Sequence, residues 1–245
     1  MKKLHMLAVI LLLAIPALAV RPMITDDYGI AEFGSHQLEC GFYSLQPRGT
    51  NDKSSSILAT ISHAMLPNAE LTIMIPYALT GSTGLQDIVV SGKIKLQEDM
   101  VSEGLSARAD VKLTNGDVDS GLGTGKANYT LMAIYTKKII WDLYTDYNIG
   151  YTWVGVPAGR RSADYFFYSA DVEYIIPHSP LIVLAELSAN NSTSPGQVAM
   201  QLAVKYAMQE NLVVDLGYNI GLNEAAYSNT LTIGFTTQIK TAAKK

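Results

Sequence analysis

Apolar and polar residues alternate along most of the chain with a period of two. Residues 227–239, 212–220 and 197–206 each carry apolar side chains at every second position, with small or polar ones between them. Residues 105–114 and 87–96 repeat the pattern with charged side chains on the polar face. This is the period of a β-strand whose two faces meet different environments. It predicts about twelve strands, centred near residues 41, 60, 73, 92, 109, 132, 148, 170, 185, 203, 216 and 233.

The segments between these strands alternate in length. Long stretches cover residues 46–54, 80–86, 115–126, 157–163, 190–196 and 221–226. Short ones separate them, at residues 67–68, 98–101, 139–140, 177–180 and 209–210. Bacterial membrane barrels have an even number of antiparallel strands, with short turns at one end and longer loops at the other. The sequence therefore predicts an all-β fold, an antiparallel transmembrane β-barrel of about twelve strands.

Residues 1–19 have the features of a cleaved signal peptide. Lys2 and Lys3 give a positive start, an apolar stretch follows, and Ala17-Leu18-Ala19 is a small-x-small cleavage site. The apolar stretch is shorter than the roughly 20 residues of a spanning helix. No later segment has 18 consecutive apolar residues. We therefore expect an exported chain that is either a membrane barrel or a soluble periplasmic β-protein.

Trp141 and Trp153 give a check on strand length. They lie twelve residues apart, on one face of a predicted strand. That spacing corresponds to about 40 Å along a strand, or roughly 30 Å of height at a tilt of about 40°. Membrane barrels carry an apolar band of about 25 Å with an aromatic girdle on each side. We expect the two tryptophans to belong to these girdles. The alternative, two core tryptophans of a soluble sandwich, would need unusually long strands.

If the apolar face contacts lipid, the opposite face lines the lumen. Charged residues of both signs lie on that face, so the lumen is either a polar conduit that selects solutes or an interior closed by salt-bridged side chains. The predicted lumen-lining residues are Glu39, Glu70, Lys93, Lys95, Arg108, Asp110, Lys112, Asp142, Asp146, Asp171, Glu173, Glu186, Lys205 and Asp215.

Composition narrows the classes of function. The 245 residues carry a net charge of −4, and loss of Lys2 and Lys3 with the leader makes it −4 − 2 = −6. This charge argues against nucleic acid as a partner. A single cysteine excludes an internal disulfide framework and a Cys-rich zinc site. With 48% hydrophobic and 16% charged residues, the chain is not disordered. We expect no metal and no cofactor.

Two short motifs each allow two interpretations. Residues 121–126, Gly-Leu-Gly-Thr-Gly-Lys, could cradle a phosphate, but they lack the Gly-Lys-Ser/Thr ending and the following helix, which favours a flexible external loop. Thr25, Asp26 and Asp27 form an N-terminal motif. It either binds a cation or caps a turn where the N-terminal segment enters the barrel, and a turn is the simpler interpretation.

Catalysis has little support. After the leader the histidines are His36, His63 and His178. A barrel hydrolase needs a histidine beside a serine at the external rim, whereas His63 and His178 fall near predicted periplasmic turns. Ser62 and His63 face opposite ways because they are neighbours in a strand. We therefore expect no enzyme.

Several motifs together resemble a known family. They are Arg21-Pro22 followed by Thr25-Asp26-Asp27 and Gly29, Gly34 with Glu39, Glu70-Leu71, Asp87-Ile88 leading to Gly92-Lys93 and Lys95, and residues 121–126. Across nearly the whole chain after the leader, this pattern resembles the "Putative MetA-pathway of phenol degradation" family. Thr232-Ile233-Gly234-Phe235 is also similar to the C-terminal signal of outer-membrane barrels, although Ile239 replaces the usual aromatic residue. The resemblance implies a barrel through which small molecules pass, aromatic ones among them.

The prediction is therefore an outer-membrane channel of a Gram-negative bacterium for small solutes, aromatic or hydrophobic ones among them. Its expected partners are outer-membrane lipid, the barrel assembly machinery and a small-molecule solute. The alternatives are a structural or adhesive barrel without transport, and a barrel hydrolase. The expected divisions are residues 1–19 as signal peptide, 20–35 as a periplasmic or plug-like N-terminal segment, 36–240 as outer-membrane barrel and 241–245 as C-terminal tail.

Overall fold

The computed structural model describes residues 21–99, 103–156 and 163–240. The signal peptide and the C-terminal tail that the sequence predicts lie outside these residues. The strands of the described part are β1 (His36–Gln46), β2 (Ser54–Leu66), β3 (Ala69–Ala78), β4 (Gly84–Leu85), β5 (Val89–Asp99), β6 (Glu103–Lys112), β7 (Asn128–Ile140), β8 (Leu143–Trp153), β9 (Tyr165–Ile175), β10 (Leu181–Asn190), β11 (Gln197–Gln209), β12 (Leu212–Gly221) and β13 (Asn229–Ile239).

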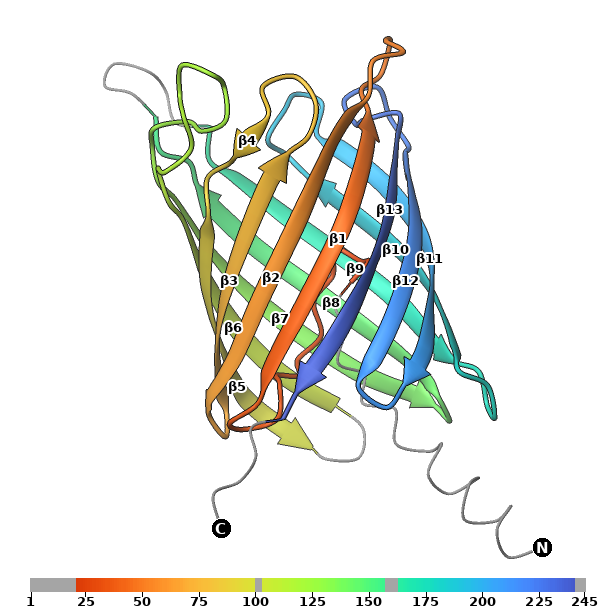
Figure 1. Cartoon of the computed structure of the whole chain (residues 1–245). Helices are drawn as coiled ribbons and strands as arrows, with labels where there is room; N and C mark the ends of the chain where they lie inside the picture. The colour runs from red at the N-terminus through yellow and green to blue at the C-terminus, as the bar shows by residue number, and fades with distance from the viewer. Residues whose placement is uncertain (1–20, 100–102, 157–162, 241–245) are drawn as a thin grey trace, which may run out of the picture.

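The long strands form a closed antiparallel barrel. Each pairs with its neighbour in sequence, β1 pairs with β13, and β2 pairs with β3, so the sheet has no free edge among its long strands. Short turns gather at the end where β1 starts and β13 stops, which we call the turn end (Figure 1). The longer connections gather at the opposite loop end. In the described residues no helix is long or apolar enough to cross a membrane.

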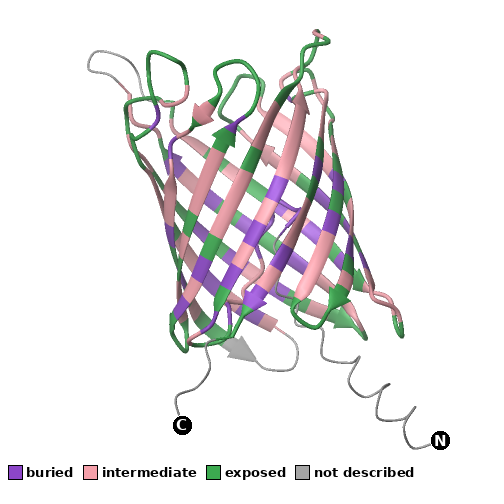
Figure 2. Cartoon of the chain, in the orientation of Figure 1, coloured by how far each residue is buried: buried purple, intermediate pink, exposed green. Residues whose placement is uncertain are grey.

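The period of two in the sequence becomes the two faces of the barrel wall. On β12, Leu216, Tyr218 and Ile220 are exposed on the outside, whereas Asp215 and Gly217 between them are buried inside. Figure 2 shows the same alternation of buried and exposed positions along the other strands. An apolar outer surface with a polar interior is the reverse of a soluble barrel and is typical of one that spans a membrane.

The strand predictions are confirmed, with small corrections at the turns. Twelve long strands occur in the described part, and the two-residue β4 lies inside a connection that the sequence predicts as loop. The turn expected at residues 139–140 lies instead at Trp141 and Asp142, where Trp141 has a φ of 45°. β7 runs to Ile140 because a register shift between Lys138 and Ile140 lengthens it. Asp142 is therefore a turn residue and not a strand residue.

The segment before β1 lies inside the barrel. Residues 21–35, which we call the plug segment, contact the inner faces of strands all around the ring. Figure 1 shows this red stretch within the barrel, running toward the turn end where β1 begins. Its position places coil backbone against the polar inner face of the sheet.

Candidate functional site

Arg21 anchors the plug segment to β1, β12 and β13. Its guanidinium donates to both Asp215 carboxylate oxygens at 3.4 and 3.3 Å, and to the Tyr43 hydroxyl at 2.7 Å. Gly41 and Gly234, which are register partners on the inner face, leave the space for it. A Cβ on Gly41 would lie 1.9 Å from an Arg21 nitrogen. The two glycines therefore form a recess for this side chain.

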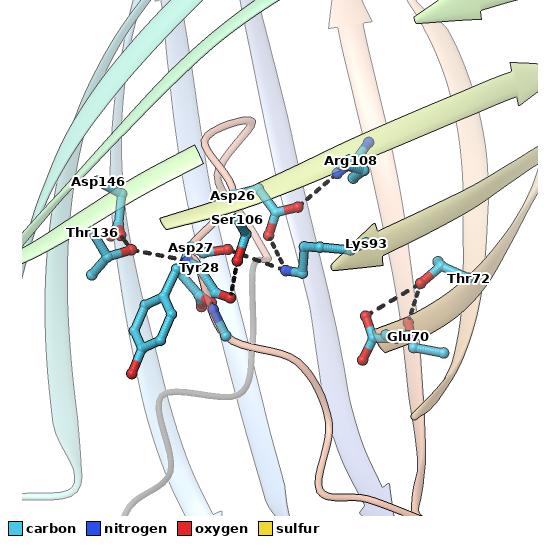
Figure 3. Close-up of polar contacts among 12 residues, drawn as sticks. Asp26, Asp27, Tyr28, Glu70, Thr72, Lys93, Ser106, Arg108, Thr136 and Asp146 are labelled. Atoms are coloured by element: carbon cyan, nitrogen blue, oxygen red, sulfur yellow. Dashed lines mark hydrogen bonds and ion pairs between the residues drawn. The ribbon is translucent and has the colours of Figure 1, made fainter. Parts of the chain in front are cut away.

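Asp26 holds the segment to β5 and β6 through two ion pairs. One of its carboxylate oxygens is 2.9 Å from Lys93 Nζ and the other is 2.8 Å from Arg108 Nη1 (Figure 3). Arg108 also donates two hydrogen bonds to Asp110. Burial alone would raise the pKa of Asp26, but the charges of Lys93 and Arg108 outweigh it and lower that pKa. Asp26 therefore stays ionised and neutralises the buried Lys93 and the half-buried Arg108.

The opposite wall, from β7 to β10, binds the backbone of the segment. The Glu186 carboxylate accepts the N–H groups of Ile24 and Thr25 at 2.8 and 2.6 Å. Asn148 accepts the N–H of Asp26 at 2.7 Å and donates to its carbonyl at 2.7 Å. Met23 packs beside these contacts in a small apolar cluster with inward-facing Ile182 and Leu184. These bonds satisfy coil backbone that would otherwise be buried without partners.

Asp27 and Tyr28 form the middle of the segment. The Asp27 carboxylate accepts the Gly29 N–H at 2.5 Å and so closes a turn. Burial raises the pKa of Asp27 to about 6, an effect that the charges of Lys93 and Asp26 modify in opposite directions. The N–H of Tyr28 donates to Thr136 at 2.9 Å.

A third glycine receives the Tyr28 ring. A Cβ on Gly104 would lie 2.2 Å from that ring, so glycine on the inner face of β6 gives it room. The Tyr28 carbonyl accepts a hydrogen bond from Ser106 at 2.6 Å. The ring position is thus fixed by the wall and by the backbone on either side of it.

The segment leaves the interior along β3 and β13. Glu70 accepts the N–H of Ala31 at 2.7 Å, and Ser35 accepts a hydrogen bond from Gln238 at 3.1 Å. Glu32 and Lys240 form a 2.9 Å ion pair at the surface, with side chains 61% and 69% exposed. Contacts therefore follow the segment from Arg21 to the first residue of β1.

The other predicted lumen residues occupy several settings. Lys205 and Glu173 form a buried 2.8 Å ion pair. Asp171 accepts the N–H of Asp146, whose carboxylate accepts the Thr136 hydroxyl. Glu39, also buried, accepts a hydrogen bond from Gln37. Lys95 and Asp142 are half-buried. Lys95 lies at a register shift of β5, and Asp142 lies in the turn between β7 and β8.

The glycine-rich segment is bound to a carboxylate of the chain itself. Asp87 accepts the N–H groups of Gly116 and Thr124 at 2.9 and 3.0 Å. Lys112 Nζ lies 2.6 Å from Asp87, at the loop end and not in the middle of the lumen. Desolvation would raise the pKa of Asp87, but these hydrogen bonds lower it overall. The backbone N–H groups of this loop therefore hold Asp87.

The tryptophans and histidines lie away from the plug segment. Trp141, 78% exposed, is at the turn end, and Trp153, 43% exposed, ends β8 at the loop end. His36 and His63 stack with ring centroids 4.4 Å apart near the turn end, and His178 lies in the turn between β9 and β10. In the part of the chain that the structure describes, no three His, Cys, Asp or Glu side chains are grouped to hold a metal ion.

Cavities remain beside the plug segment. An outer cavity of about 520 Å³ lies between the segment and the loop end, and an inner cavity of about 330 Å³ lies between it and the wall from β1 to β6. A third cavity, about 440 Å³, lies under residues 120–122. Tyr43 borders all three, and Met23 and Ile24 border the outer and inner ones. Segment and wall together thus leave an outer and an inner space that both border Tyr43, whose hydroxyl accepts a hydrogen bond from Arg21.

Several contact residues were not candidates from the sequence. Asn148, Thr136, Ser106 and Gln201 hold the segment's backbone, and neutral side chains on a polar face carry no special signal. The inner-face glycines, in contrast, could have been recognised from the sequence. A glycine on the polar face of a strand marks a place where another part of the chain approaches closely.

Comparisons with known proteins agree with this architecture. An outer-membrane channel from Pseudomonas putida F1 superimposes with a TM-score of 0.68 at 12% identity, over 89% of this chain and 100% of that one. The NanC porin gives 0.63 at 11% identity, over 83% and 100%. The KdgM porin, in complex with disordered oligogalacturonate, gives 0.60 at 10% identity, over 83% and 98%. At these identities the likeness shows the barrel fold.

The sequence comparisons complete the assignment. No curated protein matches the chain. A family model described as "Putative MetA-pathway of phenol degradation" matches residues 38–239, from β1 to the end of β13. The chain therefore belongs to this family.

Proposed function

We propose that the protein is a channel in the outer membrane of a Gram-negative bacterium, and that small solutes, aromatic ones included, cross it beside the plug segment. The observation that carries this proposal is the incomplete filling of the lumen. The outer cavity of about 520 Å³ and the inner cavity of about 330 Å³ share Tyr43, Met23 and Ile24 as common lining. We infer that a solute moves from one to the other when these shared side chains, Tyr43 among them, are displaced.

The wall supports the same proposal. Its apolar outer face fits contact with lipid, and Trp141 and Trp153, at opposite ends of β8, fit the two interfacial girdles. The barrel assembly machinery is the partner that we propose for insertion. Inside, Glu39, Lys93 and Arg108 line the inner cavity and would set its electrostatic preference.

Conductance of the reconstituted protein in planar bilayers tests this function. We expect small, infrequent currents from the native chain and larger ones from Tyr43→Ala, which removes the ring shared by both cavities. Tyr218→Ala is the matched control, because Tyr218 faces outward on β12. Bilayers that stay silent with native protein and with Tyr43→Ala would reject the channel and favour a structural barrel without transport.

A further inference from the structure

The outer cavity differs from the rest of the interior in its charge. Its described lining includes the neutral polar residues Thr130, Thr152, Ser188, Asn190, Asn219 and Thr230. Among the described lining residues the single carboxylate is Asp110, which already accepts two hydrogen bonds from Arg108 at 2.8 and 3.0 Å. An ion entering this cavity would lose hydration without gaining an opposite charge. The cavity therefore suits an uncharged solute.

Aromatic rings face into this cavity from two sides. Phe167 is an apolar ring on the inner face of β9, between Tyr165 and Ser169 on the same face. Tyr43 lines the cavity from β1, which is separated from β9 in the ring by β10 to β13.

The Phe167 ring lies against Gly150 of β8. A Cβ on Gly150 would be 2.3 Å from Phe167 Cζ, so the wall is shaped to receive this ring. A fixed aromatic face of this kind is a surface on which another ring packs.

A buried hydroxyl without a partner lies next to Phe167. Ser169, two residues further on the same inner face, lines the outer cavity and is 6% exposed. Its Oγ has no hydrogen-bond partner in the described structure. Buried polar atoms are seldom left unsatisfied, and a bound solute or water is one way in which such an atom gains a partner. A solute hydroxyl bonded to Ser169 while its ring packs on Phe167 would satisfy both groups.

We propose that the outer cavity is a binding site for an uncharged, ring-bearing alcohol, with Phe167 as the stacking surface and Ser169 as the hydroxyl partner. The proposal rests on the channel function, and it names the class of solute held on the loop side of the plug segment. The volume of about 520 Å³ lies within the range of small-molecule sites. The ring can be aromatic or saturated, since either kind presents an apolar face and can carry a hydroxyl group.

Equilibrium dialysis with the full barrel in lipid nanodiscs tests the site, with empty nanodiscs as the blank. Benzyl alcohol, benzoate and benzylamine at pH 7 share one ring and differ in charge. We expect benzyl alcohol to bind at least about tenfold more tightly than either ion. Cyclohexylmethanol separates an aromatic from a saturated ring. Equal or tighter binding of benzoate or benzylamine would overturn the proposal.

Three variants locate the bound solute. Phe167→Leu should weaken benzyl alcohol binding about tenfold, and Ser169→Ala about threefold to tenfold. Phe166→Leu is the control, because its ring faces outward from the same strand. Equal losses for Phe167→Leu and Phe166→Leu, or no loss in Phe167→Leu, would refute the site. Circular dichroism before and after heating identifies any variant that fails to fold.

Bilayer recordings on the same preparations separate this proposal from the channel function. Specific binding of benzyl alcohol by a barrel that never conducts would reject the channel and keep the site. Conductance without any ring-dependent binding would keep the channel and reject the site.

Discussion

The plug segment meets two walls that bind it by different chemistry. Toward β12, β13, β5 and β6, its side chains form ion pairs, Arg21 with Asp215 and Asp26 with Lys93 and Arg108. Toward β7–β10, its backbone N–H groups donate to wall side chains such as Glu186. The first wall binds charged side chains of the segment, and the polar contacts of the second wall are made mainly with its backbone, beside the apolar packing of Met23. A change from acid to amide should therefore have a large effect on the first side and a small one on the second.

Asp26→Asn tests the ion-pair wall and should have the largest effect. The amide leaves the buried Lys93 beside a neutral group and takes one of its two carboxylate partners from the half-buried Arg108, and breaking a buried ion pair from one side costs about 3–5 kcal/mol. We expect the open probability in planar bilayers to rise by two orders of magnitude or more, about a factor of ten for each 1.4 kcal/mol.

Glu32→Gln is the control for that variant. It also removes a carboxylate of the plug segment, but one whose 2.9 Å pair with Lys240 lies at the exposed surface. Exposed ion pairs contribute about 0–1 kcal/mol. If both variants leave the currents unchanged, the ion-pair wall does not hold the segment in place.

Gly41→Ala tests the same wall from the side of the barrel. The added methyl would overlap the Arg21 guanidinium, with distances of 1.9–2.0 Å to its atoms, so Arg21 must leave Asp215 and Tyr43. We expect open probability to rise about 30-fold or more, from the loss of about 2 kcal/mol or more of charged hydrogen bonding. Gly92→Ala is the matched strand control, since nothing lies within 4 Å of its added Cβ. An equal effect of the two would mean that strand disruption, and not loss of Arg21 binding, opens the barrel.

The wall was predictable from the sequence and the plug contacts were not, for a physical reason. A strand's environment repeats every two residues, so the inward position of Lys93, Glu186 and Asp215 follows from their polar neighbours on the same face. The contacts of Asp26 depend on where a coil without periodicity meets strands 67 and 82 residues away. No local sequence pattern predicts these long-range contacts.

The turn at Trp141 shows a smaller limit of the same kind. Strand ends are set by local register shifts, and the shift between Lys138 and Ile140 carries β7 past the predicted turn at residues 139–140. Alternation of apolar residues does not mark such a shift, because Ile139, Ile140 and Trp141 are all apolar. Among the residues that contact the plug segment, inner-face glycines such as Gly41 could have been predicted from the strand pattern, because a glycine inside a strand marks a close approach of another part of the chain.

Glu186→Gln and Glu186→Ala test the backbone wall. Glutamine keeps an oxygen that can accept the N–H groups of Ile24 and Thr25, whereas alanine removes it. We expect alanine to raise open probability about tenfold, because unsatisfied buried N–H groups cost about 1–3 kcal/mol. Glutamine should change it by about threefold or less, if it accepts the same bonds. Equal effects of the two variants would show that the charge of Glu186 matters here, which removes the distinction between the walls.

Asp27 should give a pH dependence of plug docking, a change similar in size to that of Glu186→Ala. It lies between the walls and faces Lys93, Lys205, Asp26 and Asp146. Burial raises the pKa of Asp27 to about 6, above its ordinary value of 3.8, so the docked segment binds a proton more readily than the free one. Docking is then strongest below the ordinary pKa and weakens as pH rises through about 6.

Open probability of the native barrel should therefore fall about tenfold between pH 7.5 and pH 5. The side chain of Asp27→Asn is uncharged at both pH values, so the variant should lose the part of the pH response that comes from Asp27. It keeps the part that comes from the other carboxylates, which both proteins contain. The difference between the two titrations isolates Asp27, because Asp146 and Asp26 are present in each. If the two curves are parallel, or if acid opens the native barrel more than the variant, then docking does not protonate Asp27. The segment would in that case be held by its two walls alone.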